Sequence, residues 1–352
     1  MNRTLLALLA LLYFGCKEEG TPPPSVKDPR TYSWTVDTIT YPGSFQTTMR
    51  SIYATGPDNV YITGFNDRAF GKMFRFDGIH WTDVRLNQSQ GGTISPPIDE
   101  LSKIFGFGPD NIYAVGGRFG DPPAYYDSSV VIHFNGVQWS EENTQPHRGS
   151  ILQCLWGATP TDIWAGGVNT LLHYDGIQWS DFPIEMPSQG IQFLSIAGFS
   201  TSEVYMVGSR RDASGDNDTV AYLMFRFAGT AWTLIDSSIQ VIGNPAPRFG
   251  PILGVVDQTL YSVYQGVFRY TGGNWNTVFS PPFPLGGIGG TRSSQIFTVG
   301  GESQIYHFDG STWYRYPQFQ NPNTSYLSLW TNEETIFVVG NDGSTTFVAR
   351  GR

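Results

Sequence analysis

One short pattern, an aromatic residue followed by x-Gly-x-x-Trp, recurs six times along the chain and constrains the fold more than any other feature. The six copies occupy residues 76–81, 134–139, 174–179, 227–232, 270–275 and 308–313. A seventh tryptophan, Trp34, lies ahead of them outside the pattern. A period of about 40–50 residues built from short β-segments is typical of radial or solenoid repeat proteins. We therefore expect one repetitive body instead of the several domains that length alone suggests.

Each repeat unit has the pattern of four short strands. In the clearest unit, apolar segments at residues 155–157, 163–167 and 171–174 are followed by a strand that begins near Trp179. Asp175 and Gly176, between the last two segments, are a hairpin signal. Four antiparallel strands in such a unit form one blade of a β-propeller.

An aliphatic residue marks the first strand of every unit and predicts seven blades: Ile52, Ile104, Leu155, Ile196, Ile252, Ile288 and Leu329. The last unit has no fourth strand of its own. Residues 32–36 have the pattern of a fourth strand without a unit, so we expect them to pair with residues 345–350 and close the ring. The predicted fold is all-β: a seven-bladed propeller of four-stranded antiparallel blades over residues 32–352.

Glycines at the end of the second strand carry a resemblance to known repeats. Gly-Gly doublets at residues 116–117, 166–167 and 300–301 resemble those of kelch repeats, whereas other units have a single glycine there. The Asp-Gly turns resemble Asp-box propellers, but the Asp-box order of Ser, x, Asp, x, Gly is not met. The resemblance implies a kelch-like or Asp-box-like β-propeller and does not single out one family.

The N-terminal residues 1–15 resemble a bacterial lipoprotein signal peptide. Asn2 and Arg3 precede an apolar stretch that is too short to span a bilayer, and Gly15 lies directly before Cys16. The resemblance implies that Cys16 is the lipidated N-terminus and that residues 16–31, which are rich in proline, form an extended tether. An ordinary cleaved signal and an uncleaved anchor are the alternatives.

Residues 17–19, the net charge and the cysteine count predict where the protein is located and which partners it binds. Residues 17–19, Lys-Glu-Glu, resemble the export signal that places some lipoproteins on the outside of the outer membrane. We therefore expect a lipid-anchored, outer-membrane protein at the cell surface that touches the membrane only through its lipid. The net charge of −9 argues against a nucleic-acid partner. Because Cys154 is the only other cysteine, no intramolecular disulfide is expected in the mature chain.

Residues that recur once per blade are more economically explained by packing than by binding. We expect the tryptophans of the fourth strands to fill the gaps between blades. A basic residue recurs just before the aromatic residue of the third strand, and at three positions it is a histidine: His133, His173 and His307. These histidines lie on different blades and cannot converge on one metal ion. We expect them to pair with turn acids such as Asp110 or Asp162 across neighbouring blades.

Long, irregular loops predict which face of the propeller binds. They connect the second strand to the third and one blade to the next, and they share one face, called here the loop face. The ligand-binding candidates are cationic or aromatic residues on it: Lys103, Arg118, Tyr125, Tyr126, Arg210, Arg211, Arg248 and Phe249. Pairing of Lys103 with Glu100 or with channel water, and packing of the loops on themselves, are the alternatives.

Cofactor chemistry and catalysis have weak support. Asp212, Asp216 and Asp218 offer carboxylates for Ca²⁺, but their spacing departs from a calcium loop and favours a solvated loop. No metalloprotease, phosphate-binding or serine-hydrolase motif is present. We therefore expect a monomeric, non-catalytic envelope scaffold that binds a glycan or a protein, without cofactor or metal. A carbohydrate-active lyase or glycoside hydrolase and an envelope assembly factor are the alternatives.

Overall fold

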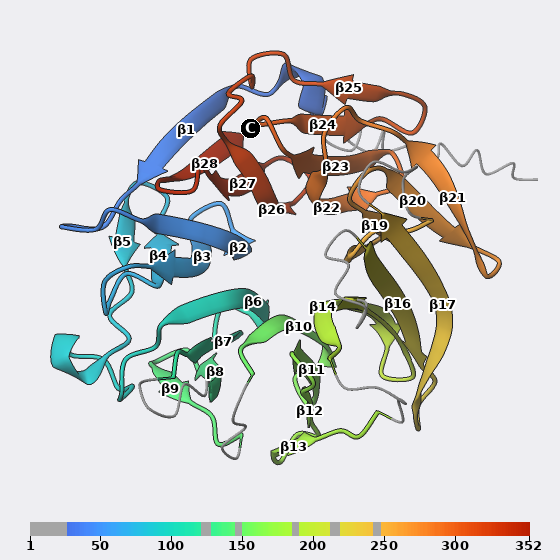
Figure 1. The fold of residues 1–352 in the computed structure, drawn as a ribbon. Coiled ribbons are helices and arrows are strands. Elements are labelled where there is room, and N and C mark those ends of the chain that lie inside the picture. Colours follow the sequence, from blue (N-terminus) through green and yellow to red (C-terminus); the bar gives the residue numbers. More distant parts are fainter. Residues whose placement is uncertain (1–26, 121–127, 145–149, 185–189, 212–218, 242–247) are drawn as a thin grey trace, which may run out of the picture.

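The computed structural model describes residues 27–352 except 121–127, 145–149, 185–189, 212–218 and 242–247. Strands dominate this part of the chain, and two short 3-10 helices, η1 (Pro29–Thr31) and η2 (Gln88–Gln90), accompany them. The sheets stand around a central axis and form a ring (Figure 1). The innermost strands are β2 (Thr47–Gly56), β6 (Glu100–Gly108), β10 (Leu152–Thr159), β14 (Gln192–Ser200), β18 (Ile252–Val256), β22 (Leu285–Arg292) and β26 (Ser325–Thr331). They contact one another in this order, and β26 contacts β2 again.

The repeat unit has the predicted architecture. One sheet contains β10 (Leu152–Thr159), β11 (Asp162–Gly167), β12 (Leu171–Tyr174) and β13 (Trp179–Asp181), paired antiparallel in chain order. The hairpin between the last two strands forms because the Asp175 carboxylate accepts hydrogen bonds from the Ile177 and Gln178 amides at 2.8 and 2.9 Å. Gly176 adopts the positive φ of +90° that this turn requires.

Three further sheets repeat this order. They contain β14 (Gln192–Ser200), β15 (Glu203–Arg211), β16 (Thr219–Phe227) and β17 (Trp232–Val241); β18 (Ile252–Val256), β19 (Thr259–Val263), β20 (Val267–Thr271) and β21 (Asn274–Phe279); and β22 (Leu285–Arg292), β23 (Gln295–Gly300), β24 (Ile305–Phe308) and β25 (Trp313–Arg315). The ten-residue β17 is much longer than β13 or β25.

The prediction of a seven-bladed propeller is wrong. The described part of the chain forms five four-stranded blades, and the remaining sheet has eight strands. Its first half contains β2 (Thr47–Gly56), β3 (Asn59–Asn66), β4 (Met73–Phe76) and β5 (Trp81–Asp83); its second half contains β6 (Glu100–Gly108), β7 (Asn111–Arg118), β8 (Ser128–Phe134) and β9 (Trp139–Glu141).

One pair of residues joins the two halves of the eight-stranded sheet. β4 pairs with β3 only from Val60 to Thr63, so the end of β3 keeps one edge free. Phe65 uses that edge to pair with Glu100, the first residue of β6. The sequence pattern does not reveal this pairing, because it depends on how far β3 continues beyond β4.

The ring closes by pairing the two ends of the described chain. β1 (Trp34–Ile39) lies antiparallel to β28 (Thr346–Gly351), which continues to β27 (Ile336–Asn341) and β26 (Ser325–Thr331). The register runs from Trp34 opposite Gly351 to Ile39 opposite Thr346. The predicted pairing of the N-terminal strand with the C-terminal segment is thus present, and β1 is the outer strand of this sheet (Figure 1).

Aromatic side chains fill the spaces between neighbouring sheets, as predicted for the tryptophan column. The Trp232 ring meets Trp164 of the preceding sheet edge to face, with centroids 5.2 Å apart, and Trp313 stacks on Phe279 at 4.7 Å. Close to the axis, glycines make room for such rings. A Cβ atom on Gly106 would lie 2.7 Å from the Tyr53 ring, which belongs to the neighbouring inner strand.

The prediction that the recurrent basic residues pair between blades is wrong. Each of these basic residues faces an aromatic residue on the adjacent strand of the same blade. Its partner lies two positions before that aromatic residue in the sequence. His173 contacts Asp162 at 2.7 Å and stacks on Trp164, whose register position it faces. The same relation holds for the pairs Arg75 and Asn59, His133 and Asn111, and Arg226 and Glu203.

His307 departs from this relation. It faces Phe297 in register, but Gln295, two positions before Phe297, bonds to Thr291 and to the Glu333 carbonyl instead. The imidazole is buried, and neither ring nitrogen has a hydrogen-bond partner. Burial and the nearby Arg30 guanidinium lower the pKa of His307 to about 4.

Within the described residues, no helix is long and apolar enough to cross a membrane.

Candidate functional site

The joint between β3 and β6 lies on the loop face and gathers aromatic and charged side chains. The Phe65 ring lies 6.2 Å from the ring of Phe119, which follows β7. Arg50 donates to the Glu100 carboxylate at 2.7 Å. Arg50 falls at a break in the register between β2 and β3, so it lies outside the ladder, and bulges of this kind re-aim side chains next to functional sites.

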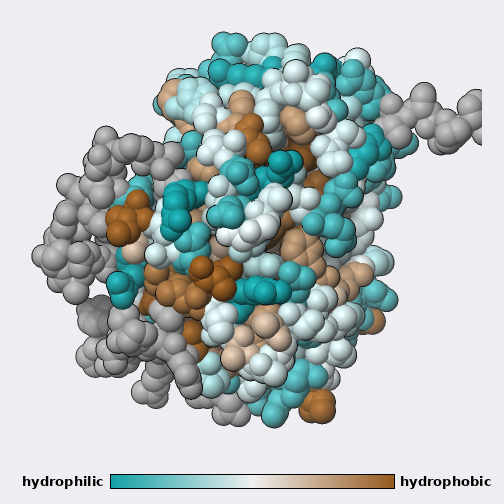
Figure 2. Space-filling model, turned by 90° about the vertical axis from the view of Figure 1, so that its right-hand side faces the viewer, coloured by the Kyte–Doolittle hydropathy of each residue, from teal (hydrophilic) through white to brown (hydrophobic). Residues whose placement is uncertain are grey.

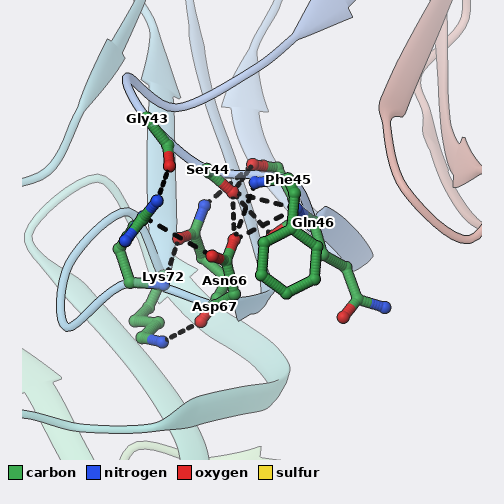
Figure 3. Close-up of polar contacts among 9 residues, drawn as sticks. Gly43, Ser44, Phe45, Gln46, Asn66, Asp67 and Lys72 are labelled. Carbon is green, nitrogen blue, oxygen red and sulfur yellow. Dashed lines mark hydrogen bonds and ion pairs between the residues drawn. The ribbon is translucent and has the colours of Figure 1, made fainter.

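The loop before β2 is held against the end of β3 by one carboxylate (Figure 3). Asp67 accepts hydrogen bonds from the Gln46 amide at 3.0 Å, from the Phe45 amide at 3.2 Å and from the Ser44 hydroxyl. Burial opposes ionisation of Asp67, but these hydrogen bonds, together with Arg68, hold its pKa below the ordinary value. The Asp67 carboxylate therefore ties residues 44–46 to the end of β3.

This anchoring leaves Phe45 in solvent. The residue is 77% exposed, although its backbone amide is bound by Asp67. The neighbouring Gln46 side chain reaches the other end of the chain, because its amide donates to the Gly343 carbonyl at 3.0 Å. A large apolar side chain that is exposed on an ordered loop is the kind of residue that binding surfaces use.

Lys72 is buried beneath Phe65 and contacts the end of β3. It is only 4% exposed, donates to the Asn66 carbonyl and lies 5.2 Å from the centre of the Phe65 ring. Burial lowers its pKa to about 8, while the charges of Asp99, Asp67 and Glu100 act in the opposite direction. Lys72 thus fixes Phe65 and the end of β3 and is not presented to a ligand.

We call the exposed part of this region the junction surface: Arg50, Phe45, Phe65, Arg68 and Phe119. Phe119 is 45% exposed, and the side chains of Arg50 and Arg68 are 43% and 52% exposed. Aromatic rings and arginines are enriched in protein-binding surfaces, because the rings bury much area and guanidinium groups donate several hydrogen bonds. The surface suits apolar side chains and carbonyl or carboxylate oxygens of a partner.

Sequence analysis named Arg118 as a ligand-binding candidate, and the structure places it beside this surface with its donors occupied. Its guanidinium forms a two-pronged ion pair with Glu141 at 2.7 and 2.8 Å and donates to the Pro96 and Pro97 carbonyls. Arg118 therefore links the segment that contains Pro96 and Pro97 to the strand β9, which contains Glu141. Phe119, the next residue, was missed, although an apolar residue that directly follows a strand on the loop face is a signal for it.

Lys103 lies on the innermost strand β6, opposite Val115. It is partly buried, and no described side chain forms an ion pair with it, so the alternative pairing with Glu100 is absent among the described residues. Burial lowers the pKa of Lys103, and the neighbouring Cys154 opposes that shift. Cys154 is itself buried with a pKa raised to about 12, mainly by burial.

The remaining candidates lie apart from the junction surface. Arg248 is bound to Asp236 and to the Ser237 carbonyl, each at 2.6 Å. Phe249 is fully buried and stacks on Trp275 with ring centres 5.7 Å apart, so it is a packing residue. Arg210 lies on β15 opposite Ala221, and the backbone of Arg211 follows it.

Several expectations fall on residues outside the described part of the chain. These are Tyr125 and Tyr126, the calcium candidates Asp212, Asp216 and Asp218, and the lipidation candidate Cys16. Within the described residues, no group of three or more His, Cys, Asp or Glu side chains is arranged to hold a metal ion.

Comparison with known proteins identifies the architecture. No protein-family model and no curated protein sequence matches the chain. YCF48 from Cyanidioschyzon merolae superposes with a TM-score of 0.58 at 12% identity, over 89% of this chain and 98% of that one. A structure of YCF48 bound to D1 peptide superposes with a TM-score of 0.62 at 13% identity, over 92% and 95% of the two chains.

The chain is a β-propeller. The extracellular domain of a hybrid two component system from B. thetaiotaomicron is also similar, with a TM-score of 0.56 at 10% identity. That match covers 86% of this propeller and 40% of the longer B. thetaiotaomicron chain. At such identities the likeness shows the fold alone, and the kelch-like and lipoprotein assignments stay predictions.

Proposed function

We propose that this propeller is a non-catalytic scaffold that holds an extended segment of a partner protein on its junction surface. The observation that carries the proposal is the fixed exposure of Phe45, whose ring is in solvent while its backbone is held by Asp67. An ordered loop loses little entropy when it binds, so the binding energy of the ring is retained. The peptide-bound YCF48 structure supports the idea that a propeller of this shape can carry a peptide.

The chemistry of the surface favours a segment with apolar side chains and accessible oxygens. Phe45, Phe65 and Phe119 offer apolar contacts. Arg50 and Arg68 offer, at the edge, the N–H donors that are not engaged by Glu100 in the first case and by Asp67 and the Gly43 carbonyl in the second. Glu100 already engages Arg50 and is only 13% exposed, so its carboxylate adds little negative charge to the surface. A glycan on the same surface is the competing outcome.

The test is selection of random peptides displayed on phage against the full chain, followed by titration of synthetic peptides from the enriched clones. Phe45→Ala and Phe119→Ala should each weaken binding about tenfold or more, as expected for aromatic residues central to an interface. Ile79→Ala and Ile177→Ala are matched controls, because these side chains are exposed in turns on the opposite face. Absence of enriched peptides, or equal loss in the controls, would contradict the proposal.

We also propose that the protein is anchored at the outer membrane through Cys16 and faces the cell exterior. The signal-like residues 1–15 support this, and so does the similarity to extracellular domains. Cys16→Ser should move the protein from the membrane fraction to the soluble fraction. Protease treatment of intact cells should digest the wild-type protein if it faces outward. Retention of the variant in membranes would argue for another anchor.

A further inference from the structure

A second concavity lies on the loop face where the sheet that contains β1 meets the sheet of β22 to β25. It is an open pocket of about 400 Å³ and shares no residue with the junction surface. We call it the seam pocket. Apolar side chains from both sheets and a set of amides and hydroxyls line it: Val36, Phe319, Tyr326, Phe347, Ser303, Gln318, Gln320, Asn321 and Thr324. Pockets of this size and mixed lining are typical of small-ligand sites.

The pocket exists because the chain turns inward after a short outer strand. β25 ends at Arg315, and the following residues Tyr316 and Phe319 fold back against Trp34, with ring centres 4.9 Å apart in both cases. Trp34, Val36 and Phe347 share one face of their sheet by register. The inward turn covers Trp34 but leaves Val36 50% exposed beside the half-buried Phe347.

The polar wall is built on a strained turn. Glu302 and Ser303 both have a φ of +52°, which non-glycine residues rarely adopt. The Ser303 amide donates to the Thr324 carbonyl at 2.7 Å, and its hydroxyl accepts from the Asn321 amide at 2.7 Å. These bonds hold the segment that carries Gln318, Gln320 and Asn321 against the pocket. Strained non-glycine residues of this kind cluster at ligand sites.

The hydrogen-bonding groups of the wall are uncharged. No charged side chain lines the pocket, and the exposed amide of Gln318 has no partner among the described residues. Asn321 accepts from the Asn323 amide at 3.0 Å through its side-chain oxygen, which leaves the amide NH₂ group to donate. The wall therefore offers donors and acceptors side by side, but no counter-ion for a charged ligand.

We infer that the seam pocket binds an uncharged saccharide. Sugar rings combine hydroxyls that pair with amide side chains and apolar C–H faces that pack on Val36 and Phe347. The strand β28, which carries Phe347, is hydrogen-bonded on both sides, to β27 and β1, and offers no edge to a peptide; β1, which carries Val36, keeps its outer edge. This site is separate from the protein-binding junction surface and does not depend on it.

The test uses the full chain and a panel of neutral disaccharides: maltose, cellobiose, lactose and N,N′-diacetylchitobiose. Saturation-transfer NMR detects binding, and titration gives the affinity. Val36→Trp should fill the pocket and weaken binding about tenfold or more, and Gln318→Ala should weaken it about fivefold, as expected for one lost hydrogen bond. Thr35→Trp is the matched control, because the adjacent Thr35 is exposed on the other face of β1.

Two controls distinguish binding in the seam pocket from binding at the junction surface and from a loss of folding. Phe45→Ala should leave saccharide binding unchanged, which distinguishes this pocket from the junction surface. Thermal unfolding of Val36→Trp should match that of Thr35→Trp, so that a loss of binding is not a loss of folding. No saturation transfer from any of the four sugars at millimolar concentration, or equal weakening by Val36→Trp and Thr35→Trp, would overturn the inference. Displacement of a bound sugar by a junction-surface peptide would do so as well.

Discussion

The indole nitrogen of Trp81 donates a hydrogen bond to the Asp37 carboxylate at 3.0 Å. Trp81 belongs to β5, in the first half of the eight-stranded sheet, and Asp37 belongs to the closing strand β1. Arg350 of β28 pairs with the same carboxylate at 3.0 Å and lies 4.6 Å from the centre of the Phe76 ring. One acidic residue thus links the closing strand, its C-terminal partner and the next sheet around the ring.

We predict that Asp37→Ala lowers the free energy of unfolding by about 1–3 kcal/mol, because it leaves the indole and the guanidinium without their acceptor. Urea unfolding followed by tryptophan fluorescence measures this change. Thr35→Ala on the same strand is the control and should alter stability by less than about 0.5 kcal/mol. A similar loss in both variants would show that Asp37 has no special role.

Removal of residues 31–40 should abolish the single cooperative unfolding transition. Without β1, the strand β28 keeps an exposed edge and Tyr316 and Phe319 lose Trp34. Differential scanning calorimetry on the shortened and full chains makes the comparison. If both chains melt in equally sharp transitions, the closing strand is dispensable.

Gly106→Ala should destabilise the protein by about 1–3 kcal/mol, because the new methyl group would overlap the Tyr53 ring and the Asn111 carbonyl, 2.7 and 2.9 Å from the Cβ position. Gly108→Ala, two residues along the same strand, has its nearest atom at 3.6 Å and should be tolerated. Thermal melting of the pair tests the packing between inner strands. Equal melting temperatures would mean that Tyr53 moves aside at no cost.

The buried His307 should make stability depend on pH. Its pKa is about 4 when folded and close to 6.5 when unfolded, so the unfolded chain binds a proton in this interval that the folded chain does not. Stability is therefore complete above about pH 6.5 and falls as the pH is lowered towards about 4, by up to about 3 kcal/mol.

His307→Phe removes the titrating group and should flatten that part of the pH profile, measured by urea unfolding at several pH values. The exposed His80 provides the control, and His80→Ala should keep the wild-type slope. A His307→Phe profile as steep as that of the wild type would assign the acid sensitivity to other groups.

The sequence is informative wherever a local pattern repeats. Residues 163–167 and 171–174 fall in β11 and β12, and β13 begins at Trp179, because hydrophobic runs and the Asp175 turn act locally. Asp162 was correctly named as a partner of the basic column, but the pairing was expected between blades, whereas the antiparallel register places His173 next to Asp162 within one blade. The periodicity identifies equivalent positions, but it does not say which strand supplies the partner.

Most residues of the candidate site could not be recognised from the sequence, because they are not part of the repeated pattern. Phe65 and Phe119 come together where Phe65 pairs with Glu100, and Phe45 is held beside the end of β3 by Asp67. Arg118 and Phe249 were conspicuous in the sequence, yet the first is used in a salt bridge and the second in the core. Exposure is decided by which neighbours cover a residue, and a single sequence does not contain that information.

The pairing of β1 with β28 also determines when the protein can fold. Trp34 is among the first residues of the propeller to be synthesised, and its partner Gly351 is among the last. No growing chain contains both strands of this ladder until the last strand of the propeller has been synthesised, and closing so long a loop is slow. The nascent chain therefore lacks the finished ring until β28 has been made.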